Sequence, residues 1–373
     1  MTRRKKLRSG YTTGACAAAA SLGAALLLRD GGSLASVELL LPAGDLARFA
    51  LAGQAFSSQR AHCFVVKDAG DDPDVTHGVE VHAELRWVAR REEDLELAAG
   101  IGIGQVTKPG LAVSVGAPAI NPVPRQMITE AVRSVFPQIP DGKALQLTLS
   151  IPDGVARAKK TLNERLGIVG GLSLLGTTGV VRPVSHKAWT DTLDVALDVA
   201  LAARVPAVVL STGRTSELAA RELNLPEEAY IMMGDFIGYC LEACHRKGVP
   251  EINLAAQFAK LVKIACGHHQ THARNAELDL DRLRAWGEEI DLDAGDCERL
   301  ELAHTAREVY QLLGAESTLV SDVAARALAL MREQLPAAGV KIQLVDYQGK
   351  IVKTFSKTAD PSPGGERAAP DVP

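Results

Sequence analysis

Short runs of apolar residues, separated by turn residues, dominate the first half of the chain. Several runs alternate between apolar and polar positions, which is the period of a β-strand with one buried face. The predicted strands are residues 37–41, 61–67, 79–89, 111–115 and 145–151. Because few helices separate them, the pattern indicates an α+β layer.

The strongest helical pattern in this half lies between Ala15 and Leu28. Thr12 or Thr13 can cap its start, and Gly31 can end it. The alternative is a secretion signal, because a basic head precedes the run. The run is too short and too rich in alanine to span a bilayer, and no clean cleavage site follows it. We therefore expect a helix of the mature protein and no membrane segment.

Prolines and glycines set two further expectations. Three prolines fall between residues 117 and 125, and each disfavours a helical conformation in the residue before it. We expect residues 117–125 to be extended and a helix to follow over 126–134. Gly100, Gly102 and Gly104 are not a dinucleotide fingerprint, because the last glycine comes one position early. They predict a tight turn or a close approach of two backbone segments.

After about residue 183, strands begin to alternate with helices. The predicted strands are residues 205–211, 230–233 and 252–256. This order is typical of a parallel sheet with right-handed crossovers, in which the loops after the strands open on one rim. The phrases at 212–214 and 234–236 and the region of Lys260 should therefore converge around a ligand crevice.

This change of rhythm predicts two domains. Residues 1–185 are expected to form the α+β domain. Residues 186–356 are expected to form an α/β domain with a Rossmann-like three-layer parallel sheet. That domain should also contain a helical insertion and a closing hairpin. The polar tail at 357–373, rich in proline and glycine, is expected to be disordered.

Composition narrows the function classes. The 373 residues include 41 Lys and Arg against 45 Asp and Glu, and aromatic residues are 4%. A nucleic-acid binder would show a basic surplus or stacking aromatics, so we expect no nucleic acid as a partner. The six cysteines are scattered through a long chain, which favours a reducing cytoplasm over a disulfide framework.

Three groupings resemble metal sites, and each has a simpler interpretation. The acidic run at 71–74 suits a hard cation or a solvated turn. The H-H-Q-T-H run at 268–272 lacks the glutamate of a zinc-hydrolase helix, although a continuing helix would place its first and last histidines on one face. Cys240 and Cys244 are best interpreted as buried thiols. We expect no protein-bound metal.

Two threonine–glycine phrases are candidates for anion binding. Y-T-T-G at 11–14 and G-T-T-G at 176–179 offer hydroxyls and amides, although a helix cap explains the first equally well. The basic residues in or beside such loops are Arg125, Arg182, Lys187, Arg214, Lys260 and Lys263. Guanidinium and ammonium groups in this setting suit a polycarboxylate or phosphate ligand.

Together these phrases resemble the cobalt-precorrin-5B C1-methyltransferase family, the CbiD type. The matching stretches include LRSGYTTGACAAAA, KDAGDDPDVTHG, GAPAINPVPRQMI, GGLSLLGTTGVVRPVS, MGDFIG and KLVKIACGHHQTHARNAELD, in the family's order from residue 7 to about 280. The resemblance argues against a cleaved signal, because cleavage would remove the opening phrase. Ala259, Asp235 and Gln270 depart from the residues usual in the family, and they leave exact contacts open.

The resemblance implies methylation of C1 of cobalt-precorrin-5B, giving cobalt-precorrin-6A in cobalamin biosynthesis. S-adenosylmethionine would be the co-substrate, and the cobalt would belong to the tetrapyrrole substrate. A substrate with many carboxylates fits the basic loops. Whether the chain forms a homo-oligomer or contacts neighbouring pathway enzymes stays open.

Site roles are assigned as hypotheses. Asp72 or Asp235 would steady the sulfonium charge, or His272 would assist a proton transfer. Substrate contacts are expected from Thr12, Thr13, Arg125, Thr177, Thr178, Arg182, Lys260 and Lys263. Cofactor contacts are expected from Thr212, Gly213, Arg214, Gly234, Asp235 and Gly238. In-line transfer from a sulfonium needs little acid–base chemistry, so catalysis is expected to be mostly positioning.

Two other functions are alternatives. A non-catalytic tetrapyrrole carrier would bind the corrinoid without a cofactor. A nucleotide- or phosphate-using α/β enzyme would exploit the same threonine–glycine loops, but the chain lacks a Walker lysine signature and a dinucleotide fingerprint.

Overall fold

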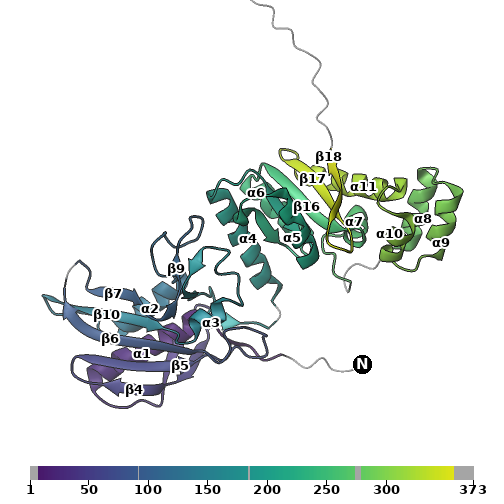
Figure 1. Ribbon diagram of the computed structural model, residues 1–373. Helices are drawn as coiled ribbons and strands as arrows, with labels where there is room; N and C mark the ends of the chain where they lie inside the picture. The colour runs from purple at the N-terminus through teal and green to yellow at the C-terminus, as the bar shows by residue number, and fades with distance from the viewer. Residues whose placement is uncertain (1–6, 91, 184, 274–278, 357–373) are drawn as a thin grey trace, which may run out of the picture. The chain divides into compact units, whose positions relative to one another are not determined.

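Figure 1 shows the computed structural model, which describes residues 7–90, 92–183, 185–273 and 279–356. The chain divides into two compact units, residues 1–204 and 205–373. Each unit has its own sheets and is described by itself. Helix α4 (His186–Ala202) falls in the first unit. The domain boundary after residue 185, which the sequence predicts, stays a prediction, and the predicted disordered tail at 357–373 lies outside the described residues.

The first unit is built around a five-stranded sheet in the order β4-β5-β6-β10-β7. These strands are β4 Ala52–Phe56, β5 Arg60–Val66, β6 Glu80–Ala89, β10 Lys143–Ser150 and β7 Leu95–Ala99. Neighbours are antiparallel except β10 and β7, which are parallel. Alternate side chains of β6, at Val81, Ala83 and Leu85, are fully buried, so one face of the sheet enters the core.

Helix α1 (Thr13–Asp30) packs against β5, β6 and helix α2 (Pro122–Val135). Thr12 Oγ1 accepts a hydrogen bond from the Ala15 amide at 3.1 Å, and Gly31, with φ of +63°, ends the helix. Both predicted caps are therefore confirmed. The small residues of α1 let its neighbours approach closely, because a Cβ on Gly14 would lie 2.6 Å from Pro124 Cγ.

Two local predictions for this unit are wrong. Residues 111–115 form no strand. Helix α2 begins at Pro122, so residues 122–125 are helical rather than extended. The first turn of a helix tolerates proline because its amide groups have no intrahelical acceptors. Asn121, which precedes the first of these helical prolines, is extended as the proline rule requires.

Short strand pairs attach the remaining segments of the first unit. The pairs are β1 (Gly10–Tyr11) with β13 (Val180–Val181), β2 (Ser36–Leu40) with β3 (Leu46–Ala50), β8 (Gly102–Ile103) with β12 (Gly171–Leu172), and β9 (Gln105–Val106) with β11 (Ile168–Val169). The short helix α3 spans Gly154–Ala158. Gly102 has φ of +76°, and a Cβ there would lie 1.8 Å from the Ile151 carbonyl oxygen. This contact confirms the predicted close approach of backbones.

The second unit contains a five-stranded sheet in the order β15-β14-β16-β17-β18. These strands are β14 Val208–Ser211, β15 Tyr230–Met232, β16 Glu251–Gln257, β17 Gly339–Val345 and β18 Ile351–Ser356. The first four strands in the order are parallel, and β18 closes an antiparallel hairpin with β17. The alternation of strands and helices in the sequence predicts this parallel core.

Helices connect these strands. In the described part of the second unit they are α5 (Arg214–Ala220), α6 (Ile237–Lys247), α7 (Phe258–Ala265), α8 (Leu280–Glu289), α9 (Ala294–Leu302), α10 (Ala306–Leu313) and α11 (Thr318–Gln334), with 3-10 turns η1 (Arg221–Leu223) and η2 (Glu227–Ala229). None of the helices described for this chain combines the length and apolar character that a membrane crossing requires.

The direction of the crossovers determines the layers of the second unit. The chain passes from β14 to β15 in one direction, and then from β15 back past β14 to β16. Right-handed connections therefore place α5 on one face and α6, α7 and α11 on the other, and α11 packs against both α6 and α7. We propose a three-layer α/β class for this unit and an α+β class for the first.

The reversal of strand order falls between β14 and β16. In open α/β sheets, the crevice at the carboxyl ends of such a strand pair is the usual ligand site. Thr212 and Gly213 follow β14 at this point, and Gln257 ends β16 just before α7. The fold therefore favours a ligand site at this rim.

We predict that Gly102→Ala destabilises the first unit more than Gly116→Ala. The φ angles of these glycines are +76° and +86°, so each substitution carries a backbone strain of roughly 1–2 kcal/mol. A Cβ at Gly116 meets no atom within 4 Å, whereas one at Gly102 collides with the Ile151 carbonyl. We expect a further loss of about 2 kcal/mol for Gly102→Ala, measured by urea unfolding. Equal losses would contradict the close packing.

Candidate active site

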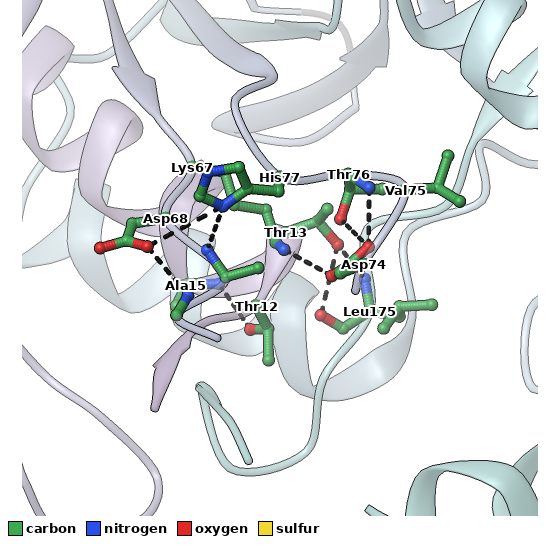
Figure 2. A network of polar contacts seen from close by, with 12 residues as sticks. Thr12, Thr13, Ala15, Lys67, Asp68, Asp74, Val75, Thr76, His77 and Leu175 are labelled. Atoms are coloured by element: carbon green, nitrogen blue, oxygen red, sulfur yellow. Dashed lines mark hydrogen bonds and ion pairs between the residues drawn. The ribbon is translucent and has the colours of Figure 1, made fainter. Parts of the chain in front are cut away.

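A cluster of buried polar groups lies where the loop after β5 meets the start of α1 (Figure 2). The Lys67 side chain is only 1% exposed, and its Nζ donates to Asp74 Oδ2 at 2.6 Å. Asp74 Oδ1 accepts from the Thr76 amide at 2.7 Å and from Thr76 Oγ1 at 2.6 Å. This ion pair therefore folds the acidic loop back onto the end of its own strand.

The Asp74 carboxylate is stabilised in its charged form. Burial raises the pKa of Asp74, but hydrogen bonds from Lys67 and Thr76, together with the lysine charge, outweigh it and lower the pKa overall. A carboxylate with this many donors is a poor proton acceptor near neutral pH. We therefore interpret Asp74 as a structural group that shapes the loop.

The threonines of the first threonine–glycine phrase are buried and have partners within the protein. Thr12 Oγ1 caps α1. Thr13 Oγ1 donates to the Ser173 carbonyl at 3.2 Å and accepts from the Leu175 amide at 3.0 Å. The Gly14 amide donates to the Leu175 carbonyl at 3.1 Å. The start of α1 is thereby joined to the segment that precedes the second phrase (Figure 2).

Further hydrogen bonds and an ion pair hold the acidic loop, residues 68–77, from its outer side. Arg8 forms a two-pronged ion pair with Asp68, which lowers the pKa of Asp68 to about 2. The Ala69 amide donates to His77 Nδ1 at 3.1 Å. Arg157 Nη1 donates to the Val75 carbonyl at 2.6 Å. These contacts hold the loop that carries the half-buried Asp72 in one conformation.

A second cluster lies at the carboxyl rim of the sheet in the second unit. Asp235 follows β15, and its Oδ1 accepts from Lys260 Nζ of α7 and from Thr271 Oγ1 at 2.8 Å. Lys260 Nζ and Lys263 Nζ both donate to the Thr271 carbonyl, at 3.2 and 3.0 Å. The Thr271 amide also donates to the Asp235 carbonyl at 3.0 Å. Thr271 is thus the centre of the cluster.

Charge in this rim cluster is unevenly distributed. Burial raises the pKa of Asp235, but hydrogen bonds from Lys260 and Thr271 outweigh it, and the pKa is lowered overall. Burial lowers the pKa of Lys263, and the neighbouring Lys260 charge lowers it further, against the attraction of Asp235. Two ammonium groups therefore share one carboxylate.

The β14 end of the same rim holds a polar atom without a partner. Ser211 is fully buried, and its Oγ has no hydrogen-bond partner among the described residues. Its neighbour Thr212 donates its amide to the Ala255 carbonyl at 3.2 Å, and the Gly234 amide donates to the Ser211 carbonyl at 3.2 Å. The loops after β14 and β15 are thus adjacent at this rim.

Comparison with known proteins shows which family the chain belongs to. The family model described as CbiD matches residues 1–183, and the model described as CbiD, C-terminal domain, matches residues 270–354. The chain belongs to the CbiD family. Among its relatives is the cobalt-precorrin-5B C(1)-methyltransferase of Geobacter metallireducens, which is 51% identical over 93% of this chain and 98% of its own length.

Two more distantly related proteins also match the chain. The cobalt-precorrin-5B C(1)-methyltransferase of Pseudomonas putida is 40% identical over 93% of this chain and 95% of its own length. A crystal structure of the cobalamin biosynthesis protein (cbiD) from Archaeoglobus fulgidus is 28% identical and covers 76% of this chain and 84% of that chain, with a TM-score of 0.39.

The structure brings several predicted site residues of this CbiD protein together. The loop of Gly234 and Asp235 converges with Lys260, as the parallel sheet predicts. Gly238 lies against His269, because a Cβ there would be 2.7 Å from its ring. Arg214 is exposed at the start of α5.

Other predicted site residues are exposed in the first unit or serve the scaffold. Thr12 and Thr13 are buried and hold backbone groups, so their environment favours a structural role. The exposed members of the predicted substrate set in the first unit are Arg125, Thr177, Thr178 and Arg182. Helix α7 ends at Ala265, so the helix does not continue through 268–272, and the condition under which the first and last histidines would share a helix face is not met.

Lys67 and Thr271 are absent from the predicted site residues. The strand run at 61–67 carries a signal for Lys67, since alternate positions of this run are buried and the lysine occupies that register just before an acidic loop. No local pattern singles out Thr271. Among the described residues, no group of three or more His, Cys, Asp or Glu side chains is arranged to hold a metal ion.

We predict that Asp74→Asn destabilises the first unit by about 3–5 kcal/mol, because it leaves the Lys67 ammonium buried without a counter-charge. Lys67→Met should cost less, since Asp74 keeps its bonds to Thr76. The double variant should therefore be more stable than Asp74→Asn alone. Chemical unfolding of all four proteins gives the coupling.

The pH dependence of stability checks the same ion pair. The pKa of Asp74 is lower in the folded state than in the unfolded state. Ionised Asp74 therefore contributes fully to the free energy of unfolding above the unfolded-state pKa of about 3.9. This contribution is lost as the pH falls through the lower pKa of the folded state. Relative to wild type, Asp74→Asn should lose this part of the acid dependence. An unchanged acid profile would contradict the assignment.

Proposed function

We propose that this protein transfers the methyl group of S-adenosylmethionine to C1 of cobalt-precorrin-5B, giving cobalt-precorrin-6A in cobalamin biosynthesis. The observation that carries the proposal is the similarity over 93% of the chain to relatives named for this activity. We place the reaction in the cytoplasm, since scattered free cysteines suit a reducing compartment.

The rim of the second unit has features that suit S-adenosylmethionine. Ser211 offers a buried hydroxyl that has no hydrogen-bond partner among the residues the structure describes. A Cβ on Gly213 would meet no atom within 4 Å, so a ligand can approach the backbone there. Both residues lie where the strand order reverses. The cofactor would supply a methyl group activated by its sulfonium, and Ser211, Thr212 and Gly213 would bind and orient it.

The cluster around Asp235 supports this rim rather than supplying a base. Its carboxylate already accepts from Lys260 and Thr271, and its pKa is lowered. We propose that Asp235 fixes the segment at 268–272 and the position of α7. His272 is exposed beside this cluster, and its role in a proton transfer stays a hypothesis, as does the role of Asp72.

The tetrapyrrole would be recognised through its carboxylates. Arg125 and Arg182 are exposed in the first unit, and a guanidinium binds a carboxylate in a planar, two-pronged geometry. Thr177 and Thr178 lie in the loop before Arg182 and offer hydroxyls. Catalysis then consists mainly of aligning the ring carbon with the methyl group, which can contribute roughly 7–11 kcal/mol.

The direct test is an anaerobic incubation with labelled S-adenosylmethionine and enzymatically generated cobalt-precorrin-5B. We expect one labelled methyl group in the product by mass spectrometry, dependent on this protein. Binding of the corrinoid without methyl transfer would point to a carrier. Thermal stabilisation by ATP or NAD but not by S-adenosylhomocysteine would favour a nucleotide-using enzyme.

We predict that Asp235→Asn and Asp235→Ala have different effects on methyl transfer. An amide oxygen can still accept hydrogen bonds from Lys260 and Thr271, so the cluster should persist. We expect kcat/KM to fall by less than about threefold for Asn and by roughly 10–100-fold for Ala. Equal and large losses in both variants would assign the function to the charge of Asp235.

A further inference from the structure

The ammonium groups of Lys260 and Lys263 meet at a single carbonyl oxygen, that of Thr271, at 3.2 and 3.0 Å. Asp235 contacts Lys260 in an ion pair. In the described part of the chain, the hydrogen-bond partner of Lys263 is the Thr271 carbonyl. Among the described residues, this half-buried cluster therefore holds two positive charges and one negative charge.

This arrangement is unfavourable if it serves the fold alone. Lys260 and Lys263 are three residues apart on α7, where like charges face each other and repel. Partial burial adds a cost to each charge, and the carbonyl shared by the two ammonium groups does not neutralise them. Lys260 is compensated by Asp235, so within the described part of the chain the surplus charge belongs to Lys263.

We propose that Lys263 binds a carboxylate of the ligand, and that the Lys260–Asp235 pair holds it in place through Thr271. The inference rests on the proposed function and deepens it. Two ligands of that reaction carry carboxylates: the methionine part of S-adenosylmethionine and the acidic side chains of the tetrapyrrole. The incoming carboxylate would balance the cluster and form a charge-assisted hydrogen bond with Nζ.

The cofactor arm of the test compares two nucleosides in calorimetric titrations. S-adenosylhomocysteine carries the amino-acid carboxylate, and 5′-methylthioadenosine lacks the amino-acid part. The proteins are wild type, Lys263→Met, Lys263→Arg, and Lys341→Met as a matched loss of one exposed lysine of the same unit. If Lys263 binds the cofactor, Lys263→Met should weaken S-adenosylhomocysteine at least tenfold and leave methylthioadenosine within about twofold.

The substrate arm uses an octacarboxylate porphyrin, followed by fluorescence quenching, and the KM for cobalt-precorrin-5B. If Lys263 binds the tetrapyrrole, Lys263→Met should raise the Kd for the porphyrin and the KM for cobalt-precorrin-5B at least tenfold each. It should leave the Kd for S-adenosylhomocysteine unchanged. Lys263→Arg should retain most of the affinity in whichever arm responds, because it keeps the charge. Lys341→Met should match wild type in both arms.

The outcomes separate this inference from the proposed function. If Lys263→Met matches Lys341→Met for every ligand, the carboxylate site is refuted even when methyl transfer proceeds. If the wild type transfers no methyl group, the proposed function fails, and a Lys263-dependent loss of porphyrin binding would still support the site. Lys263→Met removes a repelled charge together with one of the two hydrogen bonds to the Thr271 carbonyl, so we expect its thermal unfolding to stay close to wild type. If it does not, Lys263→Gln, whose amide can still donate to that carbonyl without the charge, takes its place, and wild-type affinity in Lys263→Gln would refute the site.

Discussion

The burial of the Lys67 ammonium constrains the loop between β5 and β6 and, through it, the segment that leads into α1. A charge with 1% exposure requires a counter-charge, and Asp74 supplies it only if the loop between β5 and β6 turns back on itself. That turn brings Asp68 into reach of Arg8, and the Asp68 carbonyl accepts from the Tyr11 amide at 2.8 Å. The segment leading into α1 is therefore positioned by the same loop.

The two polar clusters differ in how completely their charges are satisfied. In the first unit, Lys67, Asp74 and Thr13 have their partners within the protein, and the cluster acts as a scaffold. Among the described residues of the second unit, the buried Ser211 hydroxyl has no partner and the charge of Lys263 is not balanced. Polar groups left incomplete by the fold are the ones that a ligand can complete.

Local patterns predicted much of the architecture because they depend on short-range geometry. The period-2 alternation of β6, the cap at Thr12 and the alternation of strands with helices from β14 to β16 follow from residues near each other in sequence. The failures occurred where local rules compete. The prolines of 117–125 disfavour helix in the residues before them, but the first turn of α2 tolerates proline, and the chain is helical from Pro122.

The sequence by itself determined the change from grouped strands to strands that alternate with helices, the rim of the second unit and the resemblance that led to the family. The tertiary structure decided which polar groups meet. The contact of Thr13 with Leu175 spans 162 residues, and that of Lys260 with Asp235 spans 25, with β16 between them. No local period encodes such contacts, because they depend on how packed elements bring distant side chains together. For the same reason, only the structure separates the paired Lys260 from Lys263.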